Sequence, residues 1–365
     1  MSLKVVHLVY SFGIGGLERV IVNLINNTTA LDVQHSIITL VDDHDFASHL
    51  EPDVNLYCLD KQEGKDLMSH WRLFKLLRKI KPDVVHTYNF GTIEYQMVAW
   101  LAGASIRVHA EHGKESSYKK IETPRKYEQF RKIMAIFLNY FVVVSKDLQT
   151  WGRSRLGLSD DKLKLIFNGI SLSEFSSGDR EKKSDSYTFV CVGRLVDVKN
   201  HTLLIEAFRS ALQKEPAMAG AKLIIAGEGP NQNSLQAQVE GLGLGAHVSL
   251  VGHCADVPSV LGQSDVFVLS SKYEAMPMTA LEAMACRLPV IAPKVGGVEY
   301  ILENKVNGLL IEANNLSKMA EALVYAFQHQ DELRSMGEQG RNLVERKFSV
   351  DAMCQRYIDL YQQRS

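Results

Sequence analysis

Residues 270–293, SSKYEAMPMTALEAMACRLPVIAP, decide the fold of this chain. The apolar run just before them is typical of a buried strand. A loop with Glu274 and Pro277 follows, and residues 278–285 are good helix formers, with Pro277 suited to the first helical position. Residues 288–292 predict a second buried strand. Strand, loop, helix and strand in this order favour parallel pairing, with a ligand at the carboxyl edge of the strands.

Two glutamates of this stretch, Glu274 and Glu282, are candidates for binding that ligand. On one continuous helix their separation would be roughly 12 Å along the axis, but Pro277 lets the loop fold back so that both carboxylates face one extended ligand. The amides of Met278 and Thr279 point the same way, and helix N-termini attract phosphate. Carboxylates for hydroxyls beside amides for phosphate suit a nucleotide sugar. The alternative is a pair of solvated glutamates beside a buried helix.

Length and composition predict a soluble protein of two domains. The chain has 365 residues, of which 46% are hydrophobic and 23% charged. The net charge of −1 argues against a nucleic-acid partner, which would favour a strongly basic protein. Five scattered cysteines, without a CxxC spacing, are typical of small buried hydrophobic residues in a reducing compartment, and a catalytic cysteine is the weaker alternative.

The sequence offers no segment typical of export or membrane spanning. Lys4 leads directly into a strand and a glycine loop, without the pattern of a signal peptide. The most apolar stretch, residues 133–144, is interrupted by Asn139 and is too short to span a bilayer. We therefore expect a cytoplasmic protein, with peripheral attachment to the inner face of the membrane left open.

A glycine loop follows the first predicted strand. Residues 5–10 are apolar, residues 11–16 read SFGIGG, and residues 17–25 have the apolar spacing of a helix. Strand, glycine loop and helix form a phosphate-binding turn. A dinucleotide fingerprint, with Asp42 as the ribose acid, is an alternative, but it needs a third glycine where Glu18 stands. A tight turn without a ligand also stays open.

Strands and helices alternate through both halves, which predicts two doubly wound parallel sheets. The predicted strands include residues 106–111 and 222–226, and the predicted helices include residues near 71–80 and residues 316–328. The predicted domains are residues 1–170 and 187–345, and residues 346–365 form a final helix. Residues 171–186 are rich in Ser, Asp, Glu and Lys, without a periodic apolar face, and predict an interdomain linker.

The triplet Asp43-His44-Asp45 matches a pattern that holds a divalent metal on a diphosphate. It lies with Asp42 in a polar turn after the second strand. We interpret this turn as solvated and far from the phosphate-like loops, so no metal is expected.

A histidine and a basic segment follow a strand near the middle of the first half. His112-Gly113 comes directly after the strand, where active-site groups usually lie, although a lone histidine is more often structural. The segment from Lys114 to Lys132 carries seven basic and three acidic residues. It is either a solvated helix face or a surface for anionic lipid, and the apolar residues after it would insert shallowly or belong to the core.

The turn after the first strand of the second half carries Gly193, Arg194 and Lys199. It lies at the carboxyl edge that also holds Met278 and Thr279. Arginine grips phosphate bidentately and lysine adds a point charge, so the pair would neutralise a diphosphate leaving group without a metal. The alternative is a pair of surface charges.

Together these motifs resemble the retaining GT-B glycosyltransferases of family four, with a donor domain like that of glycogen synthase, over nearly the whole chain. In the family's order the matching motifs are Gly15-Gly16 with Glu18-Arg19, His112-Gly113, Asn168-Gly169, Gly193-Arg194 with Lys199, Gly227 to Pro230, Glu274 with Glu282, and Gly296-Gly297. Each motif is weak alone, but the ordered series is specific.

The resemblance implies an acceptor-binding first domain and a donor-binding second domain, with the active site in the cleft and the final helix crossing back. Arg194 and Lys199 would hold the diphosphate, Glu282 the ribose hydroxyls, and Glu274 the transferred sugar. The amides near Met278 and Thr279 and the turn at Gly193 would also face the donor.

The same resemblance assigns roles in the first domain. Gly15-Gly16 would approach the phosphates or the acceptor with its backbone, and His112 would touch the donor sugar. The anomeric configuration would be retained, by front-face attack in an ion pair. The resemblance implies metal-independent transfer of a hexose from a nucleotide diphosphate sugar, such as a UDP-sugar, to a glycan or lipid-linked acceptor in polysaccharide or glycolipid synthesis.

The chain departs from the family at two positions, Ala275 and Arg287, where the family usually has glycine. Ala275 would trim the sugar pocket, and Arg287 leaves the geometry of the helix exit open. Two other functions remain alternatives: an epimerase acting on a sugar nucleotide, and a binder of sugar nucleotides without catalysis.

Overall fold

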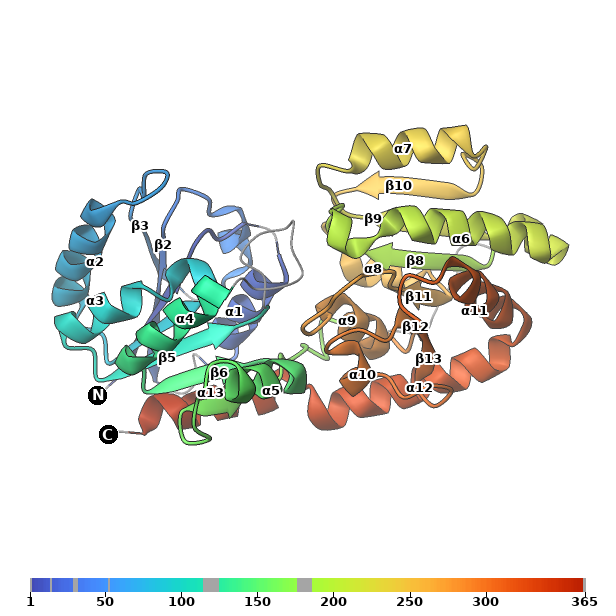
Figure 1. Cartoon of the computed structure of the whole chain (residues 1–365). Coiled ribbons are helices and arrows are strands. Elements are labelled where there is room, and N and C mark those ends of the chain that lie inside the picture. The colour runs from blue at the N-terminus through green and yellow to red at the C-terminus, as the bar shows by residue number, and fades with distance from the viewer. Residues whose placement is uncertain are drawn as a thin grey trace. The chain divides into compact units, whose positions relative to one another are not determined.

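The computed structural model describes residues 2–13, 15–28, 32–51, 53–113, 125–175 and 186–363. The chain divides into a first unit, Met1–Gly169 with Val350–Ser365, and a second unit, Ile170–Ser349. Each unit contains a wholly parallel sheet with helices, so the predicted α/β fold with two Rossmann-like domains is confirmed (Figure 1). Most of the predicted linker, residues 176–185, lies outside the described residues.

The first unit is built on a sheet in which the described residues form seven strands, in the order β3-β2-β1-β4-β5-β6-β7. Its helices and strands are β1 (Leu3–Val9), α1 (Gly16–Asn26), β2 (Val33–Thr39), β3 (Asn55–Cys58), α2 (Leu67–Ile80), β4 (Val84–Tyr88), α3 (Tyr95–Ala102), β5 (Ile106–Glu111), α4 (Arg125–Met134), β6 (Tyr140–Val143), α5 (Lys146–Ser154), β7 (Leu163–Leu165) and α13 (Val350–Gln362).

One face of the first sheet is covered by α2 and α3 (Figure 1). Apolar side chains of β1, β2 and β4 pack there against Leu73 and Leu77 of α2 and Val98 of α3. The Asp66 side chain caps α2 by accepting hydrogen bonds from the amides of Met68 and Ser69. This cap starts the helix at Leu67, four residues before the predicted start.

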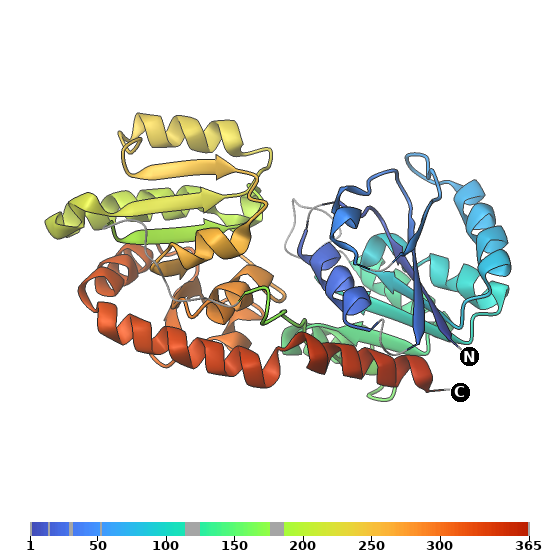
Figure 2. The ribbon, with the colours of Figure 1, turned by 180° about the vertical axis from the view of Figure 1, so that it is seen from behind.

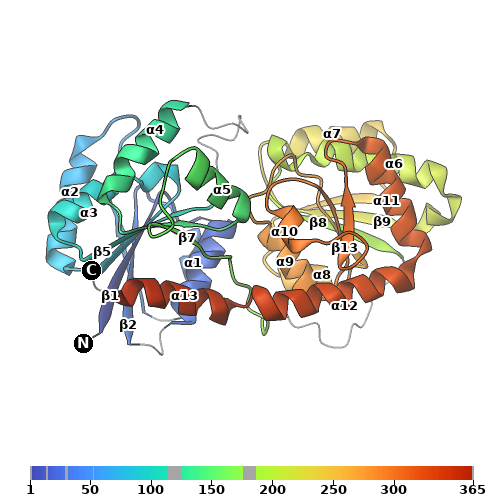
Figure 3. The same ribbon diagram turned by 60° about the horizontal axis from the view of Figure 1, so that its bottom comes forward.

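The final helix, α13, belongs to the first unit, where it packs beside α1 (Figure 3). It begins at Val350, slightly after the predicted segment 346–365. A buried network fixes it to the sheet: the Tyr361 hydroxyl lies 2.7 Å from His86 Nδ1, and the Tyr88 hydroxyl lies 2.9 Å from the same nitrogen. Tyr88 also contacts His7 Nδ1 at 2.7 Å, and His7 Nε2 lies 2.9 Å from His35 Nδ1.

The second unit is built on a sheet of six described strands in the order β10-β9-β8-β11-β12-β13. Its helices and strands are β8 (Thr188–Val192), α6 (His201–Lys214), β9 (Lys222–Ala226), α7 (Gln232–Gly241), β10 (Val248–Gly252), α8 (Val257–Gly262), β11 (Val266–Val268), α9 (Met278–Ala285), β12 (Val290–Pro293), α10 (Val298–Ile301), β13 (Gly308–Ile311), α11 (Leu316–Gln328) and α12 (Gln330–Lys347).

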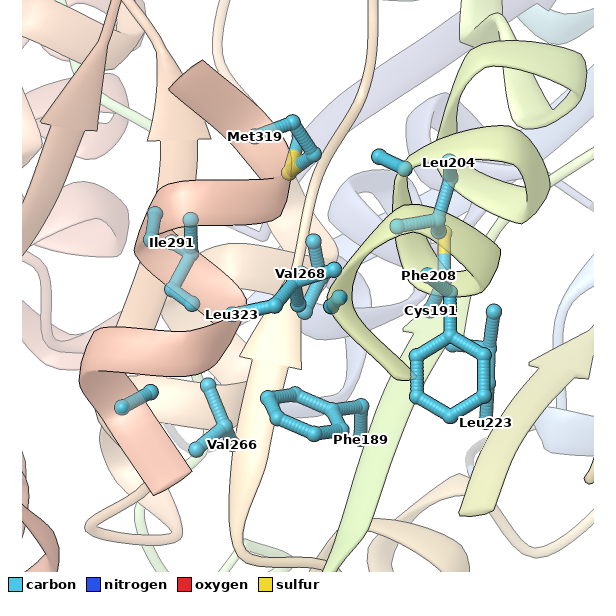
Figure 4. Packing of buried hydrophobic residues seen from close by; sticks show 14 of the residues in the cluster. Phe189, Cys191, Leu204, Phe208, Leu223, Val266, Val268, Ile291, Met319 and Leu323 are labelled. Atoms are coloured by element: carbon cyan, nitrogen blue, oxygen red, sulfur yellow. The ribbon is translucent and has the colours of Figure 1, made fainter. Parts of the chain in front are cut away.

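The core of the second unit lies where α6 and α11 cover one face of this sheet. Phe189 of β8 and Val268 of β11 are fully buried against Leu204 and Phe208 of α6 and Leu323 of α11 (Figure 4). These central strands read as continuous apolar runs because both faces of the sheet are covered. The rigid sheet places the loops after β8, β9, β11 and β12 at one carboxyl edge.

The long helix α12 packs against α9, the helix that carries Glu282 (Figure 2). Arg287 follows α9 in the left-handed region, with φ of 58°, and its Nε lies 3.0 Å from Glu338 Oε2 of α12. Gly337 of α12 lies against the backbone of Arg287, and an added Cβ at Gly337 would collide with the Arg287 carbonyl oxygen. Arg287 therefore keeps the tight helix exit that glycine usually provides.

Candidate donor-binding site

Lys199 and Glu274 meet in the second unit although they are 75 residues apart. The Lys199 ammonium donates to Glu274 Oε1 at 2.6 Å, and the two side chains are 23% and 9% exposed. Lys199 ends the short turn after β8, and Glu274 lies in the loop between β11 and α9. Because β8 and β11 are neighbours and parallel, both loops leave the same edge of the sheet.

Backbone contacts fix these two loops to each other. The Ser270 hydroxyl donates to the Lys199 carbonyl oxygen at 2.8 Å, and the Lys272 amide donates to the Val198 carbonyl oxygen at 2.7 Å. The Ser271 hydroxyl donates to Glu274 Oε1 at 2.6 Å. One cation and one carboxylate are thereby held at the sheet edge before any ligand binds.

Two glycine motifs let further loops approach this pair closely. Gly296 has φ of 50°, and a Cβ there would collide with the Glu274 carbonyl oxygen. The Gly297 amide donates to that same oxygen at 2.7 Å. Gly227 has φ of 143°, and a Cβ there would collide with the Gly193 carbonyl oxygen. Larger residues would displace both loops from the sheet edge.

Helix α9 begins four residues after Glu274, and it carries Glu282. Met278 is its first residue, and Pro277 is the residue that caps it, so the prediction of Pro277 in the first helical position was wrong by one residue. Met278 and Glu282 are buried, and Thr279 is half-buried. The first amides of a helix have no partner within the helix, which makes this end suitable for an anion.

The turn at Gly193 is also part of this edge. A Cβ at Gly193 would lie 3.7 Å from Lys199 Cε, and the side chain of the next residue, Arg194, is exposed. The second unit therefore contains every candidate residue of the donor site: Gly193, Arg194, Lys199, Glu274, Met278, Thr279 and Glu282. Lys199 and Glu274 form a direct hydrogen bond.

Gly15, Gly16 and His112 belong to the first unit. Gly15 precedes α1 in an extended conformation, and Gly16 is the first residue of that helix. A Cβ at Gly15 would collide with the Glu18 carboxylate, which folds back over the turn. Glu18 thus occupies the place where the dinucleotide pattern would need a third glycine.

The acidic turn of the first unit does not lie far from the glycine loop, so that prediction was wrong. The Phe12 amide donates to the Asp43 carbonyl oxygen at 2.8 Å, and a Cβ at Gly13 would lie 2.6 Å from Asp43 Oδ2. The cause is topological: β1 and β2 are parallel neighbours, so the loops that follow them meet at one edge. Among the described residues, no group of three acidic, histidine or cysteine side chains is arranged to hold a metal.

His112 is held by Asn89, a residue that the sequence analysis did not select. The His112 amide donates to Asn89 Oδ1 at 2.8 Å, and Asn89 itself has φ of 58°. Burial lowers the pKa of His112 to about 4, so the imidazole is neutral at pH 7. Its Nε2 is buried and makes no hydrogen bond within the described part of the chain.

The basic segment is less cationic at its surface than its sequence predicts, and its first part, residues 114–124, lies outside the described residues. Arg131 is fully buried and donates two hydrogen bonds to Glu111, at 2.7 and 3.1 Å. Burial raises the pKa of Glu111, but Arg131 and His109 together lower it to about 2. Arg125, Lys126 and Lys132 remain exposed. Ile133 and Ile136 are 55% and 74% exposed, whereas Met134 is buried.

Three residues that hold the candidate residues in place were not predicted from the sequence: Ser270, Ser271 and Asn89. Each follows a buried strand at the carboxyl edge of its sheet, and this position is the signal that points to them. Their small polar side chains alone do not distinguish a loop brace from an ordinary turn residue.

Two family models match the chain in succession. Residues 14–174 match the model of Glycosyltransferase Family 4, and residues 173–343 match that of Glycosyl transferases group 1. A UDP-Gal:alpha-D-GlcNAc-diphosphoundecaprenol alpha-1,3-galactosyltransferase of Escherichia coli is 30% identical over 309 residues, which cover 81% of this chain and 79% of that protein.

Solved structures share the whole fold. HepE of Anabaena in complex with UDP-glucose matches with a TM-score of 0.85 and 19% identity, over 98% of each chain. A glycosyltransferase of Rickettsia africae matches with a TM-score of 0.84 and 19% identity, over 99% of this chain and 98% of the other. The two parallel-sheet units, together with the two family models and the 30% identical relative, define a glycosyltransferase of the GT-B class. More narrowly, the chain belongs to glycosyltransferase family 4.

Proposed function

We propose that this chain transfers a hexose from a UDP-sugar to a glycan or lipid-linked acceptor, with retention of the anomeric configuration and without a divalent metal. The observation that carries the proposal is the contact of Lys199 with Glu274 at the edge of the second sheet, beside the N-terminus of α9. A cation for phosphate and a carboxylate for sugar hydroxyls are the chemistry that a nucleotide sugar requires.

Each residue has a role in this proposal. Arg194 and Lys199 hold the diphosphate and stabilise its growing charge as the glycosidic bond breaks. The amides of Met278 and Thr279 face the same phosphates, and Glu282 accepts hydrogen bonds from the ribose hydroxyls. Glu274 accepts hydrogen bonds from the hydroxyls of the transferred sugar.

In the first unit, the backbone at Gly15 and Gly16 approaches the phosphates or the acceptor. His112, neutral at pH 7, offers Nε2 to the sugar. The similarity to a galactosyltransferase whose acceptor is linked to diphosphoundecaprenol supports a lipid-linked acceptor.

Thermal unfolding with a panel of nucleotide sugars tests the donor assignment. A ligand present at ~100 times its dissociation constant stabilises the folded state by about 2.7 kcal/mol. A UDP-hexose should raise the melting temperature of the wild type, and the Glu282→Ala variant should lose most of this shift. A chain that no nucleotide sugar stabilises would contradict the proposed function.

We also propose that the first unit binds anionic membranes reversibly through a surface formed by α4 and the residues after it. No helix within the described ranges is long and apolar enough to cross a bilayer. Exposed Ile133 and Ile136 follow the cations of α4, and the Trp100 ring, 52% exposed, lies 5.6 Å from the Phe137 ring. Apolar side chains beside cations are the chemistry that an anionic lipid surface accepts.

Vesicle sedimentation tests this membrane contact. Each exposed cation near an anionic surface contributes about 1 kcal/mol, so changing Arg125, Lys126 and Lys132 to Glu should abolish binding at low salt. Changing the exposed second-unit residues Lys214, Arg346 and Lys347 to Glu alters the net charge equally and is the matched control. The proposal would be contradicted if wild-type protein did not bind anionic vesicles, or if both variants lost vesicle binding to the same extent.

A further inference from the structure

Ser271 has a contact pattern that the proposed function does not use. Its side chain is 1% exposed, and its hydroxyl donates to Glu274 Oε1 at 2.6 Å. The same oxygen accepts the Lys199 ammonium, also at 2.6 Å. Both donors therefore hold one oxygen of the carboxylate. Within the described residues no hydrogen bond reaches the other oxygen, Oε2.

This arrangement fixes the direction in which Glu274 points. One donor leaves a carboxylate able to turn about its Cγ–Cδ bond, whereas two donors on one oxygen restrict that rotation. Ser271 is 1% exposed, so its hydroxyl is shielded from water, and a hydrogen bond to a charged group is stronger than one between neutral groups. Oε2 is the oxygen left for a hydroxyl of the ligand.

We propose that Ser271 is a positioning residue for the donor sugar: it orients Glu274 so that Oε2 accepts a hydroxyl of the transferred hexose. This inference rests on the proposed function, because it assigns the sugar, rather than the nucleotide, to Glu274. Ser271 itself touches neither the nucleotide nor the sugar.

The role predicts a difference between two ligands. UDP lacks the sugar that Glu274 would contact, whereas a UDP-hexose carries it. Ser271→Ala should therefore weaken binding of the UDP-hexose that stabilises the wild type most by about tenfold, the effect of one hydrogen bond to a charged group. The affinity for UDP should stay within about twofold of the wild-type value.

Ser264→Ala is a matched control at the other end of the same strand. Ser264 is also buried, and its hydroxyl donates to the Val260 carbonyl oxygen at 2.8 Å, before β11 rather than after it. A general loss of packing in the second unit would lower the affinity of both variants for both ligands. If Ser271 is a positioning residue, only the affinity of Ser271→Ala for the UDP-hexose falls.

A double-mutant cycle with Glu274→Gln, read by calorimetry with UDP-hexose and UDP, decides the inference. If Ser271 acts through Glu274, adding Ser271→Ala to Glu274→Gln should cost less than twofold. Additive losses, equal weakening of UDP and UDP-hexose, or wild-type affinity in Ser271→Ala would each overturn the proposal. If Ser271→Ala does not fold, Ser271→Cys keeps the side-chain shape but replaces the hydroxyl with a weak hydrogen-bond donor, and it is subject to the same criteria. Wild-type protein that binds no nucleotide sugar would instead contradict the proposed function, and this inference with it.

Discussion

Lys199 and Glu274 show how single residues of this chain depend on one another. In the structure the lysine already has its carboxylate partner, and its ammonium shares that contact with the diphosphate when the donor enters. Charge on the diphosphate grows as the glycosidic bond breaks, so Lys199 should stabilise the transition state more than the bound donor.

Lys199→Ala should lower kcat on the order of 10²-fold or more, with a smaller change in donor affinity, because it removes one electrostatic stabiliser. Glu282→Ala should behave differently, since the ribose contact is the same before and after the transition state. It should weaken donor binding and leave kcat less affected. Steady-state kinetics with a UDP-sugar separate the two effects, and one common pattern in both variants would refute these roles.

The sequence predicts that both residues belong to one site, because both follow buried strands and such loops share one edge of a parallel sheet, but it does not predict their direct contact. It does not predict Ser271, because a serine beside a charged loop has the same pattern whether or not it donates to a carboxylate. Arg131 shows the opposite case. Its charge indicates a solvated face, but its partner Glu111 lies 20 residues away, so only the fold shows that it is buried.

Among the elements, strands β5 and β9 and helices α9 and α11 have the bounds that the sequence predicts. Their apolar residues are buried or half-buried throughout, so the apolar pattern extends to both ends of each element. Helix α2 starts earlier than predicted because Leu67 and Met68 are 81% and 59% exposed and do not follow the buried pattern. The cap at Asp66, rather than hydrophobic periodicity, sets that boundary.

The packing of α9 on α12 supplies a prediction for an unusual glycine. Gly→Ala within a helix normally stabilises by roughly 0.5–1 kcal/mol. Gly337→Ala should instead destabilise by about 1–3 kcal/mol, because the new Cβ would collide with the Arg287 carbonyl oxygen. Urea unfolding measures the difference.

Gly241→Ala is the control for this substitution. Gly241 also lies in a helix, α7, and an added Cβ there would meet open space. This variant should be as stable as the wild type or more so. Gly337→Ala protein with wild-type stability would show that α12 does not press on the exit of α9.

At the scale of the whole molecule, the buried histidines predict how stability depends on pH. Burial lowers the pKa of His35 to about 4, and burial also lowers the pKa of His7 and His86. An unfolded histidine has a pKa of about 6.5, so the unfolded chain binds more protons below that pH. The contribution of these neutral histidines to the free energy of unfolding is fully present above pH ~6.5, and it is lost as the pH falls towards about 4.

His35 alone should account for about 3 kcal/mol of this loss, the free energy of its pKa difference. Thermal unfolding at pH 7.5 and pH 5.0 should show about 2 kcal/mol of this loss, because pH 5.0 still lies above the folded pKa, and His35→Gln should reduce the pH dependence. His49→Gln, at an exposed histidine, should leave it unchanged. Equal stability at both pH values would contradict a neutral buried network.

The arrangement of two parallel sheets follows from the alternation of strands and helices, and the family follows from an ordered series of short motifs. The substrate does not follow from either, because the same loops at a sheet edge bind many donors and acceptors. The contact of Lys199 with Glu274 supports the proposal of a charged, hydroxylated ligand, and the reaction products test the transfer.

Metal-independent transfer with retention is tested by an NMR time course of the product formed from a UDP-α-hexose and a polyprenyl-diphosphate-linked sugar in excess EDTA. An α-linked product should form at the same rate with and without EDTA, because Arg194, Lys199 and the amides of α9 neutralise the leaving diphosphate. A β-linked product, or one that forms only after magnesium or manganese is restored, would contradict the proposed transfer.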